Sequence, residues 1–151
     1  MSIENRLTEL GITLPGAPAP AANYVPFVQT GNLVFISGQI SQNEAGLITG
    51  KLGDAMSVEQ GAEAARRCGL ALIAQLKAAV GDLDRVKRVV KLTGFVNSTP
   101  DFTEQPKVVN GCSDLMVQVF GDAGRHARAA VSAPSLPLGV SVEIEAVFEI
   151  A

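Results

Sequence analysis

Two residues near the C-terminal end of the chain carry groups suited to work on a small carboxylic acid. Arg128 has a planar guanidinium, which can donate two parallel hydrogen bonds to a carboxylate. Glu143 has a carboxylate, which can orient a water molecule or remove its proton. The residue types therefore favour a small-molecule site in which Arg128 holds an acid and Glu143 acts on water.

The strand patterns around these residues predict that their side chains lie close together. In residues 140–150 the even positions are apolar and most odd positions are polar, so the even face is expected to form the core. If residues 125–133 and 140–150 form a hairpin around Leu136-Pro137, Arg128 lies on the polar face. It is then about one residue pair from Glu143 along a diagonal, within reach of long side chains.

Residue types alone leave three interpretations of this face open. A cross-strand salt bridge between Arg128 and Glu143 on a solvated face is common and individually weak. A small-molecule site is the sharper alternative. The small residues expected beside the pair, Ala130, Ser132 and Ser141, are also typical of a packed interface between subunits, which a sheet covered by helices on one side can use to bury its other side.

Other residues that could carry chemistry give weaker signals. His126 could act as a general base, although no motif places a Ser or Cys nucleophile beside it. Cys68 and Cys112 lack CxxC spacing, so we expect buried thiols, and one histidine cannot complete a zinc site. Residues 46–51 are not a phosphate loop, because the glycines are one residue too close and Leu52 stands where Ser or Thr is required. We expect neither a metal nor an organic cofactor.

Two stretches with helical spacing must help to position these groups. Apolar or small residues recur three and four apart through residues 57–80, where Ser57 and Gln60 fit a capping box and Gly81 fits a C-terminal cap. A second run, residues 106–120, has proline in its first turn and the same apolar spacing. We expect both helices to pack one face against a sheet.

The remaining segments have strand character, with β-branched or alternating residues. The expected strands are residues 24–29, 32–40, 85–97, 125–133 and 140–150. Thr30-Gly31-Asn32 is a hairpin turn signal between the first two. The resulting order predicts one α+β domain over residues 1–151, a mixed sheet with two helices packed on one face.

Composition excludes several broad classes of protein. The 151 residues are 47% hydrophobic and 18% charged with a net charge of -3, which is typical of one globular domain and counts against nucleic acid as an obligatory partner. No apolar stretch approaches the roughly 20 residues that span a bilayer. The N-terminal residues lack the apolar core of a secretory signal, so we expect a cytoplasmic protein and no membrane partner.

Several motifs in fixed order resemble those of the reactive intermediate deaminase family, also called the Rid or YjgF family. They are Ser37-Gly38-Gln39, Ala127-Arg128-Ala129-Ala130-Val131, Leu136-Pro137 and Val142-Glu143-Ile144-Glu145-Ala146. Their order and spacing are similar to the family pattern along nearly the whole chain after about Ala19. The segment from Phe120 to His126 resembles a branch of the family with an FGxxGRHAR-type sequence.

The resemblance implies a chorismate-mutase-like fold, assembled as a homotrimer with sites in the clefts between subunits. It also implies cofactor-free hydrolysis of 2-imino or 2-enamino acids, such as 2-aminoacrylate, to 2-oxo acids and ammonia. Arg128 would hold the substrate carboxylate and Glu143 would position the attacking water. The other implied pocket residues are Gly38 and Ala130 through their backbone, Ser37 and Asn110 as lining residues, and Phe27 as an apolar wall.

The chain departs from the family pattern at one wall of this pocket. Many members have a tyrosine where this sequence has Phe27, and the only tyrosine here is Tyr24, which is the alternative source of a hydroxyl group. Two other functions stay open: a trimeric module that binds a small carboxylate without catalysis, and an endoribonuclease, which the acidic composition disfavours.

Overall fold

The computed structural model describes residues 2–19 and 22–151. Its helices are α1 (Ile3–Glu9), α2 (Val58–Val80) and α3 (Gln105–Phe120), with short 3-10 helices η1 (Leu83–Arg85), η2 (Gly121–Gly124) and η3 (Pro137–Gly139). Its strands are β1 (Phe27–Thr30), β2 (Leu33–Ile40), β3 (Gln42–Asn43), β4 (Gly46–Leu47), β5 (Val86–Asn97), β6 (Ala127–Ala133) and β7 (Val142–Ile150).

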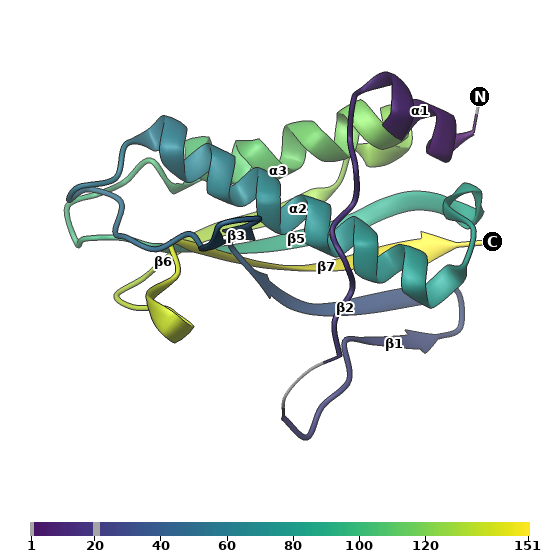
Figure 1. Cartoon of the computed structure of the whole chain (residues 1–151), viewed down its shortest axis with the longest axis horizontal. Helices are drawn as coiled ribbons and strands as arrows, with labels where there is room; N and C mark the ends of the chain where they lie inside the picture. Colours follow the sequence, from purple (N-terminus) through teal and green to yellow (C-terminus); the bar gives the residue numbers. More distant parts are fainter. Residues whose placement is uncertain (1, 20–21) are drawn as a thin grey trace.

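The long strands form one mixed sheet, and α2 and α3 lie side by side on one face of it (Figure 1). The strand order is β1-β2-β7-β5-β6, in which only β5 and β6 run parallel. The core lies between this face and the two helices, where Leu72, Leu115 and Phe148 are fully buried. The expected α+β fold with two helices on one face is confirmed.

The ends of α2 follow from local sequence. The Ser57 hydroxyl accepts from the amide of Gln60, and the Gln60 side chain accepts from the amide of Ser57, so the predicted capping box is present. Gly81 ends the helix at φ 80°, where a residue with a Cβ would be strained. The helix α3 begins one residue before the predicted start, with Pro106 in its first turn.

Glycines allow α2 and α3 to pack closely. A Cβ on Gly111 of α3 would overlap the main-chain carbonyl of Ala62 on α2. A Cβ on Gly69 of α2 would press on Leu115 and Cys112 of α3. The close helix pair fixes the height of α3 above the sheet, and therefore the position of every side chain that α3 directs toward β6.

The prediction that the last two strands, β6 and β7, form a hairpin is wrong. The strand β6 pairs in parallel with β5, and β7 lies between β2 and β5, so β5 separates β6 from β7. The physical reason is the connection through α3: a strand, a helix and a following strand form a crossover that returns the chain parallel to its start. The Pro-rich segment 134–140 then carries the chain to the centre of the sheet.

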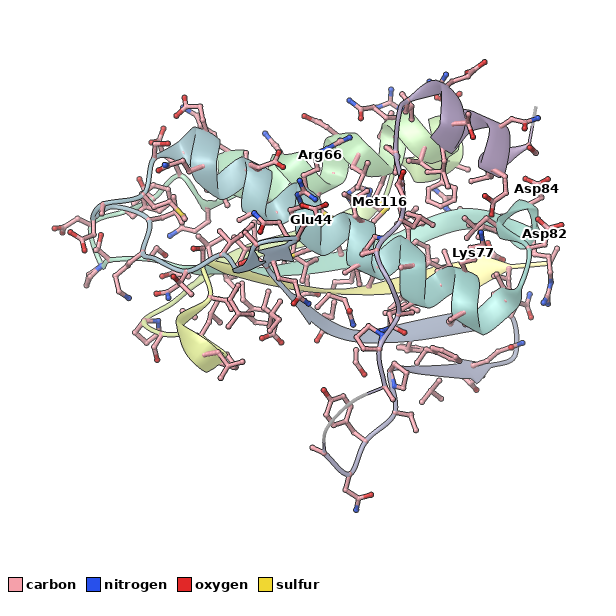
Figure 2. The ribbon with its side chains drawn as sticks, in the orientation of Figure 1. Glu44, Arg66, Lys77, Asp82, Asp84 and Met116 are labelled. Atoms are coloured by element: carbon pink, nitrogen blue, oxygen red, sulfur yellow. The ribbon has the colours of Figure 1, made fainter. Side chains whose placement is uncertain are left out.

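A short helix that was not predicted from the sequence, α1, precedes the sheet. Ser2 caps α1 by accepting from the amide of Asn5, and the amide of Ile3 donates to Asp84 at 2.7 Å. The adjoining segment crosses the outer side of α2 (Figure 1), and Lys77 of α2 forms an ion pair with Glu4 at 2.7 Å. Figure 2 shows Lys77 and Asp84 at the end of the molecule where α1 is attached.

The other face of the sheet exposes apolar side chains. The α-helices α1, α2 and α3 lie on the opposite side of the sheet (Figure 1). Val28, Phe35 and Val131 are 53%, 44% and 43% exposed, and their strand positions place all three on this face. We call it the open face. Exposed apolar surface of this kind is typical of a protein interface.

None of the helices in the described ranges is long and apolar enough to cross a membrane.

Candidate functional site

Arg128 lies on the helix side of the sheet, next to α3. It pairs with Leu92 of β5, which in turn pairs with Ala146 of β7, and both of these residues are buried under the helices. The Nη1 atom of Arg128 donates to Oδ1 of Asn110 at 2.7 Å and to Oγ of Ser113 at 3.1 Å. Asn110 and Ser113 are three residues apart on α3, so they project from the same side of the helix.

His126 belongs to the same group of side chains. Its Nε2 lies 2.8 Å from Oγ of Ser113, and its Nδ1 lies 2.6 Å from the carbonyl oxygen of Gly124. His126 and Asn110 were expected from the sequence as possible site residues, whereas Ser113, which lies between His126 and Arg128, was not. We call Arg128, Asn110, Ser113 and His126 the arginine cluster.

Glu143 lies on the opposite face of the sheet from Arg128. It pairs with Phe95 of β5 and with Ile40 of β2, and it alternates with the buried residues Val142 and Ile144. The expectation that Arg128 and Glu143 share a face is therefore wrong, because it depended on the hairpin that does not form. Because β5 lies between β6 and β7, Arg128 is aligned with the buried residues Leu92 and Ala146. It therefore lies on their face of the sheet and not on the face of Glu143.

Neither charged group has an ion-pair partner among the described residues. Arg128 is half-buried and held by neutral oxygen acceptors. Glu143 is half-buried, and burial together with the nearby Glu145 carboxylate raises the pKa of Glu143 above its ordinary value of 4.5. The salt bridge considered from residue types is not formed, and both groups remain available to a ligand.

Gly38 lies against Glu143 on the open face. The register of β2 shifts between Ile36 and Gln39, and this bulge brings the Gly38 backbone to the glutamate. A Cβ on Gly38 would overlap Oε2 of Glu143. A side chain at position 38 would therefore displace the Glu143 carboxylate from the place that it occupies.

Three of the expected pocket residues line one surface hollow. Tyr24, Ser37 and Gly38 border a hollow of about 140 Å³ that also contacts Pro18 and Gln75. The Ser37 hydroxyl donates to the carbonyl of Val25 at 2.8 Å, which fixes the chain just before β1. Tyr24 is 56% exposed, so its hydroxyl is accessible from solvent.

The remaining two expected pocket residues point elsewhere in this chain. Phe27 is paired with Ile36 and packs its ring against the core, outside the residues that border the hollow of Tyr24. Ala130 is paired with Gly94 and its methyl group also packs against the core. Ala130 can therefore offer a ligand its backbone, as the resemblance implies, but not its side chain.

The cysteines are buried, as predicted. Burial raises the pKa of the Cys112 thiol to about 12, and it also raises the pKa of Cys68. Both thiols are thus protonated and chemically inert at neutral pH. Within the described ranges, no three His, Cys, Asp or Glu side chains are grouped so that they could hold a metal ion.

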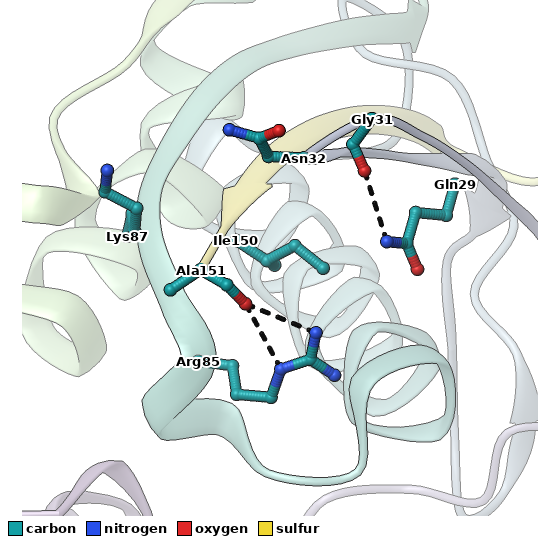
Figure 3. Close-up of a pocket in the computed structure, with 7 residues that line it drawn as sticks. All are labelled: Gln29, Gly31, Asn32, Arg85, Lys87, Ile150 and Ala151. Atoms are coloured by element: carbon teal, nitrogen blue, oxygen red, sulfur yellow. Dashed lines mark hydrogen bonds between the residues drawn. The ribbon is translucent and has the colours of Figure 1, made fainter.

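Two larger hollows are bordered by arginines other than Arg128, and the second of them adjoins the hollow of Tyr24 at Pro18 and Gln39. One, of about 540 Å³, is bordered by Arg85, Lys87 and Ala151, and its arginine is already bound to the carbonyl of Ala151 at 3.4 and 3.2 Å (Figure 3). The other, of about 500 Å³, lies between the N-terminal segment and α2, near Arg67, whose guanidinium pairs with glutamates. In both, the arginine is committed to groups of this chain.

Comparison with known proteins identifies the class and then the family. A family model described as "YjgF/chorismate_mutase-like, putative endoribonuclease" matches residues 4–149. The chain is thus an α+β protein with a chorismate-mutase-like fold, as the resemblance implied. It belongs to the YjgF family. The narrower likeness to an FGxxGRHAR-type branch, and the cytoplasmic location, stay predictions.

Relatives cover nearly the whole chain. Protein TCP17 of Trypanosoma cruzi is 53% identical over 95% of this chain and 91% of its own length. A protein of Dermatophagoides farinae named 2-iminobutanoate/2-iminopropanoate deaminase is 31% identical over 90% of this chain and 92% of its own. A protein of unknown function from Agrobacterium tumefaciens, whose crystal structure is known, is 49% identical in sequence to this chain. The two structures have a TM-score of 0.90, and the match covers 99% of this chain and 94% of the other.

Proposed function

We propose that this protein hydrolyses reactive 2-imino and 2-enamino acids, such as 2-aminoacrylate, to 2-oxo acids and ammonia without a cofactor. The observation that carries the proposal is Arg128, a half-buried guanidinium that is held in place by two neutral acceptors and has no carboxylate partner among the described residues. Such a group is prepared to bind an anion. The relative named as an iminobutanoate and iminopropanoate deaminase supports the choice of substrate class.

The reaction consumes one water molecule, and both protons of that water end on the nitrogen that leaves as ammonia. The enamine first isomerises to the imine as a proton moves from nitrogen to carbon, and the imine carbon is electrophilic. Water adds to this carbon as Glu143 removes one proton and returns it to the imine nitrogen. The resulting carbinolamine then forms the 2-oxo group and expels ammonia as Glu143 transfers the hydroxyl proton to the same nitrogen. The products are one 2-oxo acid and one ammonia for each water consumed. The raised pKa of Glu143 favours a carboxyl group that can both take and return a proton.

Arg128 and Glu143 meet, in this proposal, between two copies of the chain in a homotrimer. They lie on opposite faces of one sheet, so a single chain does not bring them to one ligand. The apolar open face beside Glu143 offers the surface that such an assembly would bury. Arg128 and Asn110 would come from one subunit, and Glu143, Gly38 and Ser37 from its neighbour.

The direct test follows pyruvate release from 2-aminoacrylate that a dehydratase generates in the same vessel. Arg128→Lys keeps the charge but loses the bidentate fork, so we expect KM to rise about 10- to 100-fold. Glu143→Gln keeps the shape but removes the base, so we expect kcat to fall about 10²- to 10⁴-fold with the Kd for pyruvate unchanged. Arg125→Lys and Glu149→Gln are matched controls at other exposed or half-buried positions and should retain the parental constants.

The outcomes separate the alternatives. Parental turnover by Glu143→Gln would remove the catalytic assignment and would favour a carboxylate-binding module. A wild-type protein that neither accelerates pyruvate release nor binds pyruvate would contradict the proposed function altogether.

A further inference from the structure

With a neutral His126, only one assignment of donors and acceptors satisfies all the hydrogen bonds of the arginine cluster. The Gly124 carbonyl can only accept, so the proton of a neutral His126 lies on Nδ1, 2.6 Å from that oxygen. The Nε2 atom then carries a lone pair and accepts the hydroxyl proton of Ser113 at 2.8 Å. A serine hydroxyl has a single proton, so the Ser113 oxygen turns a lone pair toward Arg128 and accepts from Nη1 at 3.1 Å.

This assignment determines which part of Arg128 is left for a ligand. The two protons of Nη1 are taken by Asn110 and Ser113. The Nε and Nη2 atoms have no hydrogen-bond partner among the described residues, and they form the side of the guanidinium that binds a carboxylate with two parallel bonds. Protein oxygens therefore fix one side of the guanidinium while the opposite fork stays free.

We propose that Ser113 and His126 are positioning residues for the carboxylate site. His126 orients the Ser113 hydroxyl, and Ser113 holds Nη1 so that the free fork of Arg128 is set before the ligand arrives. The inference rests on the proposed function for its ligand, a 2-oxo or 2-imino acid, but not for the hydrogen-bond chain itself. Pre-setting a long side chain lowers the entropy cost of binding.

The first arm of the test compares binding with turnover. Ser113→Ala should raise KM, and the calorimetric Kd for pyruvate, by about 3- to 10-fold, because one neutral hydrogen bond is lost, while kcat stays within about twofold. Ser113→Thr retains a hydroxyl and should restore both constants. Asp114→Asn, at the next residue of α3 and outside the cluster, is the matched control and should change neither. His126→Phe keeps a ring without an acceptor and should behave as Ser113→Ala does.

The second arm needs no ligand. The chain has a single histidine, so a long-range ¹H–¹⁵N correlation spectrum of the labelled protein above pH 8 contains one imidazole pattern. We expect the imidazole proton of His126 on Nδ1 and no proton on Nε2. The Nη1 protons of Arg128 should exchange slowly with solvent in the wild type and in Ser113→Thr, and faster in Ser113→Ala.

The results of the test distinguish a failure of the positioning role from a failure of the proposed function. A proton on Nε2, or Arg128 exchange that Ser113→Ala leaves unchanged, would overturn the positioning role. So would a loss of kcat in Ser113→Ala without any change in KM or Kd. Absence of pyruvate binding by the wild type would contradict the proposed function alone, because the histidine pattern and the arginine exchange would still decide the role of Ser113 and His126.

Discussion

The two charged residues of the proposed site, Arg128 and Glu143, have different surroundings. The half-buried guanidinium of Arg128 donates to oxygen acceptors of Asn110 and Ser113, neither of which carries a charge. Glu143 has no such support, and burial favours its protonated form. In the proposed reaction, Arg128 is the fixed group that binds the anion, and Glu143 is the group that takes and returns the proton.

The sequence supplied the identities of these residues but not their relation in space. Arg128 and Glu143 stand out by type and by motif, whereas their shared face depended on strand pairing, which is not a local property. The sequence contains a weak indication of the role of Ser113. Ser113 follows Asn110 by three helical positions, so the two side chains share a side of the helix. His126 precedes Arg128 by two positions, so these two side chains share a side of the strand. Only the parallel pairing of β5 and β6 brings the two sides together.

The raised pKa of Glu143 makes the stability of the protein depend on pH. Burial is the main cause and Glu145 is the second, so folding favours the protonated carboxyl. Its stabilising contribution is complete below the ordinary pKa of 4.5 and is lost as pH rises through the folded pKa. Glu143→Gln cannot ionise, so its unfolding midpoint in urea should rise relative to the wild type between pH 4 and neutral pH. Glu149→Gln is the control. If the difference in unfolding midpoint between Glu143→Gln and the wild type stays constant over this pH range, the prediction is contradicted.

At the scale of elements, local signals were sufficient for helices and strands but not for their pairing. The capping box at Ser57 and the glycine at position 81 depend on neighbours within four residues, and both were predicted correctly. The partners of β6 and β7 depend on how α3 returns the chain across the sheet, for which alternation within a strand carries no information. The order of a strand, a helix and a strand was the signal that favours a parallel crossover.

The contact of α2 with α3 predicts a large effect of one methyl group. Gly111→Ala gains about 1 kcal/mol of helix propensity, but its Cβ would overlap the main-chain carbonyl of Ala62, which cannot rotate away. Overpacking typically costs about 1–3 kcal/mol, and here the clash is with main-chain atoms, so we expect a net loss in the free energy of unfolding measured in urea.

Gly16→Ala is the matched control for this substitution, because its Cβ meets no atom within 4 Å. Equal stability of the Gly111→Ala protein and the wild type would show that the helices can move apart at no cost.

At the scale of the whole molecule, the open face determines the predicted assembly. Wild-type protein at micromolar concentration should scatter light with a mass near three times 15.7 kDa. Phe35→Asp places a charge among the exposed apolar residues of this face, so we expect monomers that keep their circular dichroism but lose turnover. Ala78→Asp, on the exposed side of α2, should remain a trimer. A monomeric wild type would exclude both the trimer and a site shared between copies.

The place of β7 in the sheet has a consequence for how the protein is made. The strand β7 lies between β2 and β5, yet it follows every other strand in the chain. A ribosome adds about 5–20 residues per second, so β2 and β5 wait several seconds with unpaired edges until β7 leaves the exit tunnel. The nascent chain is therefore the form most open to strand pairing with its neighbours on a polysome, and it is the stage at which a chaperone would protect this protein most.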